Sequence, residues 1–282
     1  MRHHPAIQPG RAAVITGGAS GIGLAAAKRF AGLGMKVLLA DLDARELDAA
    51  AGAITSESPG AEVVTVPCDV SKIEEVRALK DRAYAAFGDV AVLMNNAGTG
   101  PGGGPFDHYD RWQRVLGVNL WGVINGVHAF SEVIIAQGNA AMIVNTGSKQ
   151  GITCPPGDTA YNVSKAGVKV ITEGLQHALR STPGCKVTAH LLVPGWTHTK
   201  LTAGGRAEKP AGAWWPEQVI DLLFERTARG DFYIICPDNE VSWETDRKRV
   251  LWGAGDIAEN RPPLSRWHGG YDEAFKAFLA KD

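Results

Sequence analysis

Short apolar runs alternate with longer stretches of helical periodicity along most of this chain. The runs show little alternation between apolar and polar residues, which is typical of strands buried on both faces of a parallel sheet. Six runs are each followed by a helix or a helix-bearing loop, and a shorter seventh comes later. The runs are "AAVIT", "KVLLAD", "EVVTVPCDV", "VAVLMNNAG", "AAMIVNTGS", "KVTAHLLVPG" and "DFYIIC". The predicted helices between them cover residues 24–32, 44–54, 72–87, 111–136 and 161–180.

This order predicts an α/β fold with a single, doubly wound parallel sheet of about seven strands and helices on both faces. No linker or shift in composition interrupts it, so we expect one domain over residues 11–236. Ligands of such folds bind at the carboxyl ends of the strands. Residues 1–10 are expected to form a flexible leader. Residues 237–282 are expected to be an extension packed on the same domain, with a last helix near residues 271–280.

A glycine-rich stretch, "TGGASGIG", joins the first strand to the first helix. A phosphate can approach the backbone only where side chains are absent, and the first turn of the helix offers free N–H groups to it. Gly17, Gly21 and Gly23 suit that task. A lone glycine turn is weak evidence, but its position between strand and helix favours a dinucleotide site.

Two acidic residues close the next two strands. Asp41 follows Gly23 at nearly the spacing where an acid binds the adenosine ribose, and its charge would repel a 2′-phosphate. Ser20 and Leu42 stand where NADP enzymes could carry a cation, so we predict NAD. Asp69 could meet the adenine amino group. Either acid could instead cap the helix that follows it.

Tyr161 and Lys165, in "YNVSK", lie four residues apart on a predicted helix and so share one face. A nearby ammonium favours the phenolate, so we expect Lys165 to lower the pKa of Tyr161. Such a pair alone occurs in many helices by chance. Ser148 closes the fifth strand, at the same edge of the sheet, and Asn119 needs a partner for its amide among apolar neighbours.

In this order, these motifs resemble the short-chain dehydrogenase/reductase family, with its Rossmann-like fold, over roughly residues 11–200. The resemblance also covers "NNAG" and "PGWTHT". It implies a catalytic set of Asn119, Ser148, Tyr161 and Lys165 that moves a hydride between nicotinamide and an alcohol or carbonyl carbon. Bacterial members with an extended tail are the most similar.

The resemblance assigns a role to each of these residues. Tyr161 would exchange the proton and Ser148 would hold the substrate oxygen. Lys165 would bind the nicotinamide ribose, and Asn119 would support a water chain from Lys165 to bulk. Cofactor contacts are implied for Gly17, Ser20, Gly21, Ile22, Gly23, Asp41, Asp69, Val70, Asn96, Ala97, Gly98, Tyr161, Lys165, Pro194, Gly195, Thr197 and Thr199. His190, on the sixth strand, is expected to be structural.

Aromatic residues are expected to wall the substrate pocket. A loop over about residues 196–216 has the position of a substrate lid. Large rings there would favour a bulky apolar or aromatic substrate, although a sugar can also stack on tryptophan. The expected pocket residues are Gln150, Cys154, Trp196, Trp214 and Trp215. Alternatively, Trp214 and Trp215 only pack the loop onto the body.

Composition and net charge limit the classes of binding partner that we expect. The 282 residues are 45% hydrophobic and carry a formal net charge of -1, which gives no reason to expect nucleic acid or an anionic membrane as partner. No apolar run reaches the length of a membrane span, and the N-terminus lacks a signal-peptide core. The four cysteines form no C-x-x-C pair, so we expect a reducing, cytoplasmic location and no metal site. His3 and His4 are assigned to the leader.

The leading hypothesis is an NAD-dependent oxidoreductase that interconverts a secondary alcohol and its ketone, as a homodimer or homotetramer. A dehalogenase or lyase on the same fold would not need the nucleotide pocket. A nucleotide-sensing regulatory protein would not need the proton relay. Each alternative therefore leaves part of the motif set unexplained.

Overall fold

Seven parallel strands form one sheet in the order β3-β2-β1-β4-β5-β6-β7 in the computed structural model, which describes residues 3–206 and 208–280. Every pair of neighbouring strands is parallel. The strands are β1 (Ala12–Thr16), β2 (Lys36–Asp41), β3 (Val63–Pro67), β4 (Val92–Asn95), β5 (Ala141–Thr146), β6 (Val187–Val193) and β7 (Tyr233–Ile235). The predicted doubly wound α/β fold is confirmed.

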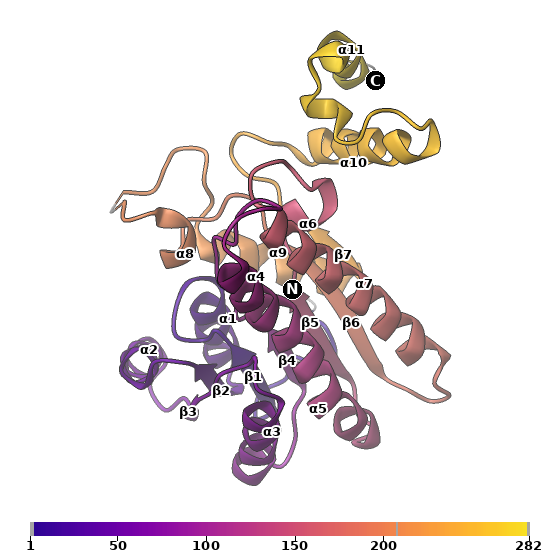
Figure 1. Cartoon of the computed structure of the whole chain (residues 1–282). Helices are drawn as coiled ribbons and strands as arrows, with labels where there is room; N and C mark the ends of the chain where they lie inside the picture. Colours follow the sequence, from indigo (N-terminus) through magenta and orange to yellow (C-terminus); the bar gives the residue numbers. More distant parts are fainter. Residues whose placement is uncertain (1–2, 207, 281–282) are drawn as a thin grey trace.

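Helices cover both faces of this sheet (Figure 1). One face packs against α1 (Gly21–Gly32), α2 (Ala44–Glu57) and α9 (Pro216–Ala228). The other packs against α3 (Ile73–Phe87), α5 (Gly122–Ala136) and α7 (Thr159–Ser181). The central strands are fully buried, β1 at all five positions and β5 at all six, which explains their uninterrupted apolar sequence.

The predicted helix over residues 111–136 is built from three pieces. α4 (Tyr109–Leu116) leads into a π-helical turn, η1 (Gly117–Trp121), which continues into α5. By length and composition, the stretch Tyr109–Ala136 could cross a membrane, but half of its most apolar window is buried inside the protein. A core helix that packs on a sheet has the same properties.

The N-terminal residues that the structure describes, 3–10, pack against the domain. Ala6 and Ile7 belong to its hydrophobic core, and His4 is buried. The Nδ1 atom of His4 accepts a hydrogen bond from the backbone of Ala6 at 3.1 Å, and its Nε2 lies 3.1 Å from the Thr188 hydroxyl on β6. The predicted flexible leader is therefore wrong for residues 3–10, because this segment buries apolar and hydrogen-bonding groups. Residues 1 and 2 lie outside the described chain.

After β7 the chain forms α10 (Trp243–Ala258), two short 3₁₀ turns, η2 (Ser265–Trp267) and η3 (Gly269–Tyr271), and α11 (Asp272–Ala280). α10 packs against α6 (Gln150–Thr153), and α11 packs against α10, so these helices project from one end of the domain (Figure 1). The indole of Trp252 holds the extension together by a 2.8 Å hydrogen bond to Ser265 and by contact with Phe275. The extension thus meets the domain through α10 and through the loop that precedes it.

Candidate active site

A cavity of about 1030 Å³ lies at the carboxyl ends of the strands, where the fold predicts a ligand. It extends from the glycine-rich turn after β1 to the first turns of α7. The predicted site residues that line it are Gly17, Ser20, Gly21, Ile22, Asp41, Asp69, Val70, Asn96, Ala97, Gly98, Ser148, Gln150, Tyr161, Lys165, Pro194, Gly195, Trp196, Thr197 and Thr199.

In the glycine-rich turn, a side chain at Gly17, Gly21 or Gly23 would strain the backbone or clash with neighbouring atoms. Gly17 and Gly21 have φ angles of +63° and +52°, a region that favours glycine. A Cβ atom on Gly17 would lie 2.8 Å from the Cα of Ala97. A Cβ atom on Gly23 would lie 2.1 Å from the carbonyl oxygen of Gly17, so Gly23 packs the helix onto the turn instead of lining the cavity.

Asp41 ends β2 at the rim of this cavity. Its carboxylate accepts hydrogen bonds from the backbone of Leu42 at 2.8 Å and of Ala19, within the glycine-rich turn, at 3.2 Å. The cap of the following helix is Asp43, which accepts from Arg45 at 2.8 Å. The helix-cap alternative for Asp41 is therefore wrong.

Asp69 lies in the turn before α3, whose N-cap is Lys72, so Asp69 does not cap that helix, and its contact with adenine stays a prediction. Its carboxylate accepts from the backbone and the hydroxyl of Ser71, at 3.0 and 2.7 Å, and so orders the turn before α3. It also lines the cavity. These hydrogen bonds fix the direction of the carboxylate at the cavity wall.

Taken together, these residues fit a dinucleotide. The turn after β1 carries no side chain at Gly17 or Gly21, and it opens directly into the first turn of α1, whose N–H groups suit a pyrophosphate. Asp41 stands at the end of the next strand, as a ribose-binding acid requires. Gly17, Gly21 and Asp41 would thus hold the phosphates and the adenosine ribose.

The first two turns of α7 bring Tyr161 and Lys165 to the same cavity. The nitrogen of Lys165 lies 5.8 Å from the centre of the Tyr161 ring and donates a 2.8 Å hydrogen bond to the Thr146 carbonyl at the end of β5. Ser148, two residues after Thr146, hydrogen-bonds the side chain of Tyr161. A hydroxyl donor, a phenol and an ammonium therefore converge on one point.

Burial is the largest cause of the pKa shifts of Tyr161 and Lys165. It raises the pKa of Tyr161; the hydrogen bond with Ser148 opposes that rise, and the negative charge of Asp158 adds to it. Burial also lowers the pKa of Lys165 to about 8. Lys165 is not among the groups that shift the pKa of Tyr161 here, so the lowering of that pKa by Lys165 stays a prediction.

Asn119 is fully buried in the π-helical turn η1, beside the cavity. Its side-chain oxygen accepts from the backbone N–H of Thr99 at 2.7 Å, and its nitrogen donates to the Thr99 carbonyl at 3.0 Å and to the Ser164 hydroxyl at 3.2 Å. The buried amide of Asn119 therefore has the hydrogen-bond partners that we expected it to need. It fixes the loop after β4 against α7, and its role in a water chain remains a prediction.

The substrate side of the cavity matches the prediction only in part. Trp196 and Gln150 line it, whereas Cys154, Trp214 and Trp215 do not. Trp214 packs against the hydrophobic core, and its backbone pairs with Trp196 and His198, so it fastens the loop to the body. Trp215 lies at a second depression and contacts the ring of His198. In the loop 196–216, residue 207 lies outside the described residues.

His190 has the structural role that was expected. It is buried on β6, where its ring nitrogens lie 2.8 Å from the Asp231 carbonyl and 2.9 Å from the Thr188 hydroxyl. Burial lowers the pKa of His190, and the Asp231 carbonyl partly offsets the shift. The ring joins β6 to the segment just before β7.

Sequence reasoning missed Asp158, which caps α7 and lines the cavity. Its carboxylate accepts from the backbone N–H of Tyr161 at 3.2 Å and of Gly103 at 2.9 Å. It therefore ties the loop after β4 to the helix that carries Tyr161. An Asp three residues before Tyr161 was a readable cap signal, but its second partner, 55 residues away, was not.

A model of the short chain dehydrogenase family matches residues 11–210. The 1-deoxy-11-beta-hydroxypentalenate dehydrogenase of Streptomyces exfoliatus is 35% identical over 263 residues, which are 91% of this chain and 94% of that protein. The 3beta-hydroxysteroid dehydrogenase 2 of Eggerthella lenta is 33% identical over 213 residues, 75% of this chain and 80% of that protein.

Two solved structures are also similar. A short chain dehydrogenase/reductase from Burkholderia phymatum in complex with NAD is 36% identical with a TM-score of 0.81, covering 90% of this chain and 96% of that one. A metagenomic short-chain oxidoreductase in complex with NADP is 27% identical with a TM-score of 0.68, covering 82% and 98% of the two chains. Similar structures thus bind either form of the cofactor.

Proposed function

This chain belongs to the short-chain dehydrogenase family of oxidoreductases, and we propose that it uses NAD(H) to interconvert a secondary alcohol and its ketone. The observation that carries this proposal is the meeting of Ser148, Tyr161 and Lys165 in one cavity with the glycine-rich turn. A cofactor held by that turn and a substrate held by Ser148 and Tyr161 would share this cavity.

The chemistry follows from the positions of these side chains. An alcohol oxygen beside Ser148 and Tyr161 gives its proton to the phenolate form of Tyr161, which acts as the general base and becomes a neutral phenol. Ser148 donates a hydrogen bond to that oxygen as negative charge develops on it. Bound NAD would supply the hydride acceptor for the carbinol carbon. Lys165 would hold the nicotinamide ribose, and reduction of the ketone reverses these roles.

Asp41 supports NAD over NADP. Its carboxylate is held at the cavity rim by the backbone of Ala19 and Leu42, where it would repel a 2′-phosphate. Lys200 is a cation whose charge interacts with Asp41, and its side chain forms an ion pair with Glu46. This pair is exposed and therefore weak, so the preference for NAD rests on Asp41.

A bulky apolar substrate is supported by Trp196 and by the names of the relatives. Trp196 presents a large ring to the cavity, and Pro101 and Leu201 add apolar surface. A hydroxysteroid dehydrogenase and a hydroxypentalenate dehydrogenase are among the relatives. We therefore propose a secondary hydroxyl on a large apolar carbon skeleton.

A homodimer or homotetramer is part of this proposal. The helices α5 and α7 present large apolar side chains to solvent, among them Val133, Val163 and Val170. Paired helices from a second copy would cover them. We also propose a cytoplasmic location, which suits the four free cysteines of the described chain.

A panel of secondary alcohols tests the proposed function. The protein is incubated with NAD and each alcohol, and NADH formation is followed by absorbance, with short primary alcohols as comparison. We expect turnover with bulky cyclic secondary alcohols and little with short primary ones. NAD binding without turnover of any alcohol or ketone would favour a nucleotide sensor instead.

A further inference from the structure

Lys149, the residue after Ser148, makes two ion pairs with the C-terminal part of the chain. Its side-chain nitrogen lies 3.2 Å from Asp238 and 2.6 Å from Asp246. The three side chains are 17%, 8% and 6% exposed, so these charges lie away from solvent. Removal of one partner from a buried ion pair is strongly destabilising, because the other charge stays buried without compensation.

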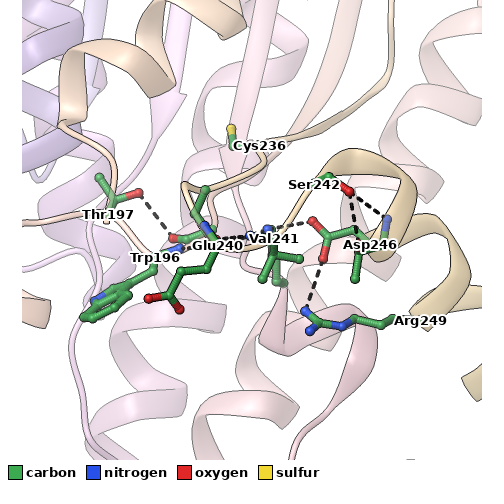
Figure 2. Close-up of polar contacts among 12 residues, drawn as sticks. Trp196, Thr197, Cys236, Glu240, Val241, Ser242, Asp246 and Arg249 are labelled. Carbon is green, nitrogen blue, oxygen red and sulfur yellow. Dashed lines mark hydrogen bonds and ion pairs between the residues drawn. The ribbon is translucent and has the colours of Figure 1, made fainter. Parts of the chain in front are cut away.

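The two carboxylates come from different segments of the extension. Asp238 lies in the loop after β7, and Asp246 lies in the first turn of α10, with the guanidinium of Arg249 3.8 Å away. Figure 2 shows Asp246 between Ser242 and Arg249 at the start of this helix. α10 packs on α6, the short helix that begins directly after Lys149. We call Lys149, Asp238 and Asp246 the Lys149 cluster.

The same cluster contacts the turn that carries Trp196. The backbone N–H of Trp196 lies 3.4 Å from the Asp238 carboxylate, and the backbone N–H of Lys149 donates to the Pro194 carbonyl at 3.3 Å. A Cβ atom on Gly195 would lie 2.9 Å from Asp238 and 3.0 Å from the Lys149 side chain. Lys149 and Asp238 thus contact the backbone of the turn that lines the cavity, the turn that carries Trp196 and Thr197 (Figure 2).

We propose that the Lys149 cluster positions Ser148 and Trp196, so that the C-terminal extension sets the geometry of the active site from outside the cavity. Lys149, Asp238 and Asp246 are positioning residues, because they act through Ser148 and Trp196. Displacement of a reacting group by about 1 Å can cost about 100-fold in rate. Loss of one carboxylate should therefore lower kcat while the distant adenosine site keeps its affinity for NAD.

The experiment compares two isosteric substitutions on α10, and its kinetic part rests on the proposed function. Asp246→Asn breaks the buried pair, and Glu244→Gln breaks the exposed pair with Arg247, whose atoms lie 3.0 Å apart. We expect Asp246→Asn to lower kcat about tenfold or more, with an unchanged Kd for NADH, and Glu244→Gln to change neither. Asp238→Asn is the second variant if Asp246→Asn does not fold.

A double-mutant cycle with Ser148→Ala separates positioning from general destabilisation. Because part of the effect acts through Ser148, Asp246→Asn should lower kcat by a smaller factor in the Ser148→Ala background than in the wild type. A full additional loss in that background would overturn the proposal. Equal kinetics of Asp246→Asn and Glu244→Gln would also overturn it.

Crystal structures of the wild type, Asp246→Asn and Glu244→Gln test the same proposal without turnover. We expect the Ser148 hydroxyl and the Trp196 ring to shift relative to Tyr161 only in Asp246→Asn. Unchanged positions would overturn the proposal. Absence of turnover in the wild type would contradict the proposed function, and the structures would still decide the positioning role.

Discussion

The side-chain nitrogen of Lys165 lies 2.8 Å from the carbonyl oxygen of Thr146, and this hydrogen bond ties α7 to the end of β5. Lys165 follows Tyr161 by about one helical turn, and Thr146 precedes Ser148 by two residues. The bond therefore fixes the proposed general base relative to the proposed hydrogen-bond donor. It buries the Lys165 amino group, and burial lowers its pKa to about 8.

Lys165→Met is expected to stabilise the fold while it abolishes turnover. At pH 7 the folded protein holds a charged ammonium with a pKa lowered from 10.5 to about 8. This shift corresponds to a penalty of about 3 kcal/mol. Loss of the hydrogen bond to Thr146 offsets about 1 kcal/mol of the gain. Urea unfolding at pH 7 should show a free energy of unfolding about 2 kcal/mol higher in the variant.

The same variant should change the alkaline stability profile. Between pH 8 and 10.5 the unfolded wild type binds more protons at Lys165 than the folded protein, so its stability rises with pH in this window. Lys165→Met should lack that rise. Lys169→Met, which removes a partly exposed lysine of the same helix, is the control and should keep it. A variant less stable than the wild type at pH 7 would contradict the account of Lys165.

Asp41→Asn should weaken discrimination against NADPH, because it removes the charge that would repel a 2′-phosphate. The ratio of the Kd values for NADPH and NADH, from fluorescence titration, should fall about tenfold, or about 1.4 kcal/mol. Asp43→Asn removes a charge two residues away and keeps a good helix cap, so it should change the ratio less than about twofold. Equal effects of the two substitutions would argue against a specific role for Asp41.

The motifs near the strand ends were predictable because local rules govern them. The glycine-rich turn must accept positive φ angles, and Tyr161 and Lys165 share a helix face through their spacing alone. The second partner of Asp158 and the pairing of Lys149 with Asp246 depend on contacts far apart in sequence, which no local pattern contains. The sequence therefore predicted the proposed catalytic and cofactor-binding residues well, but it did not predict the residues that position them.

Two wrong predictions, the flexible leader and the pocket role of Trp214, have the same physical origin. The segment with His4 and Ile7 has no periodicity that marks it as part of a core, yet it packs against the completed domain. Trp214 is a large aromatic residue of the kind expected to line a substrate pocket, but in the tertiary structure it packs against the hydrophobic core. Side-chain direction in loops is set by the assembled fold, so composition alone could not decide these cases.

His4 should make stability fall in mild acid. Burial, reinforced by the charge of His190, lowers the pKa of His4 from 6.5 to about 4. Between these values the unfolded chain binds more protons, so stability decreases as pH falls. From pH 7 to pH 5 the wild type should lose about 2 kcal/mol more than His4→Gln in urea unfolding. Equal losses in the two proteins would show that His4 does not titrate in this way.

The central claim is that Tyr161 transfers the proton, and Tyr161→Phe tests it most directly. Turnover is measured with the best alcohol of the panel, and the Kd for NADH is measured by fluorescence titration on the same preparation. The account predicts a loss of kcat of about 1000-fold or more, because the general base is removed, with a Kd within about twofold of the wild type. Retention of most of the wild-type kcat by Tyr161→Phe would contradict it.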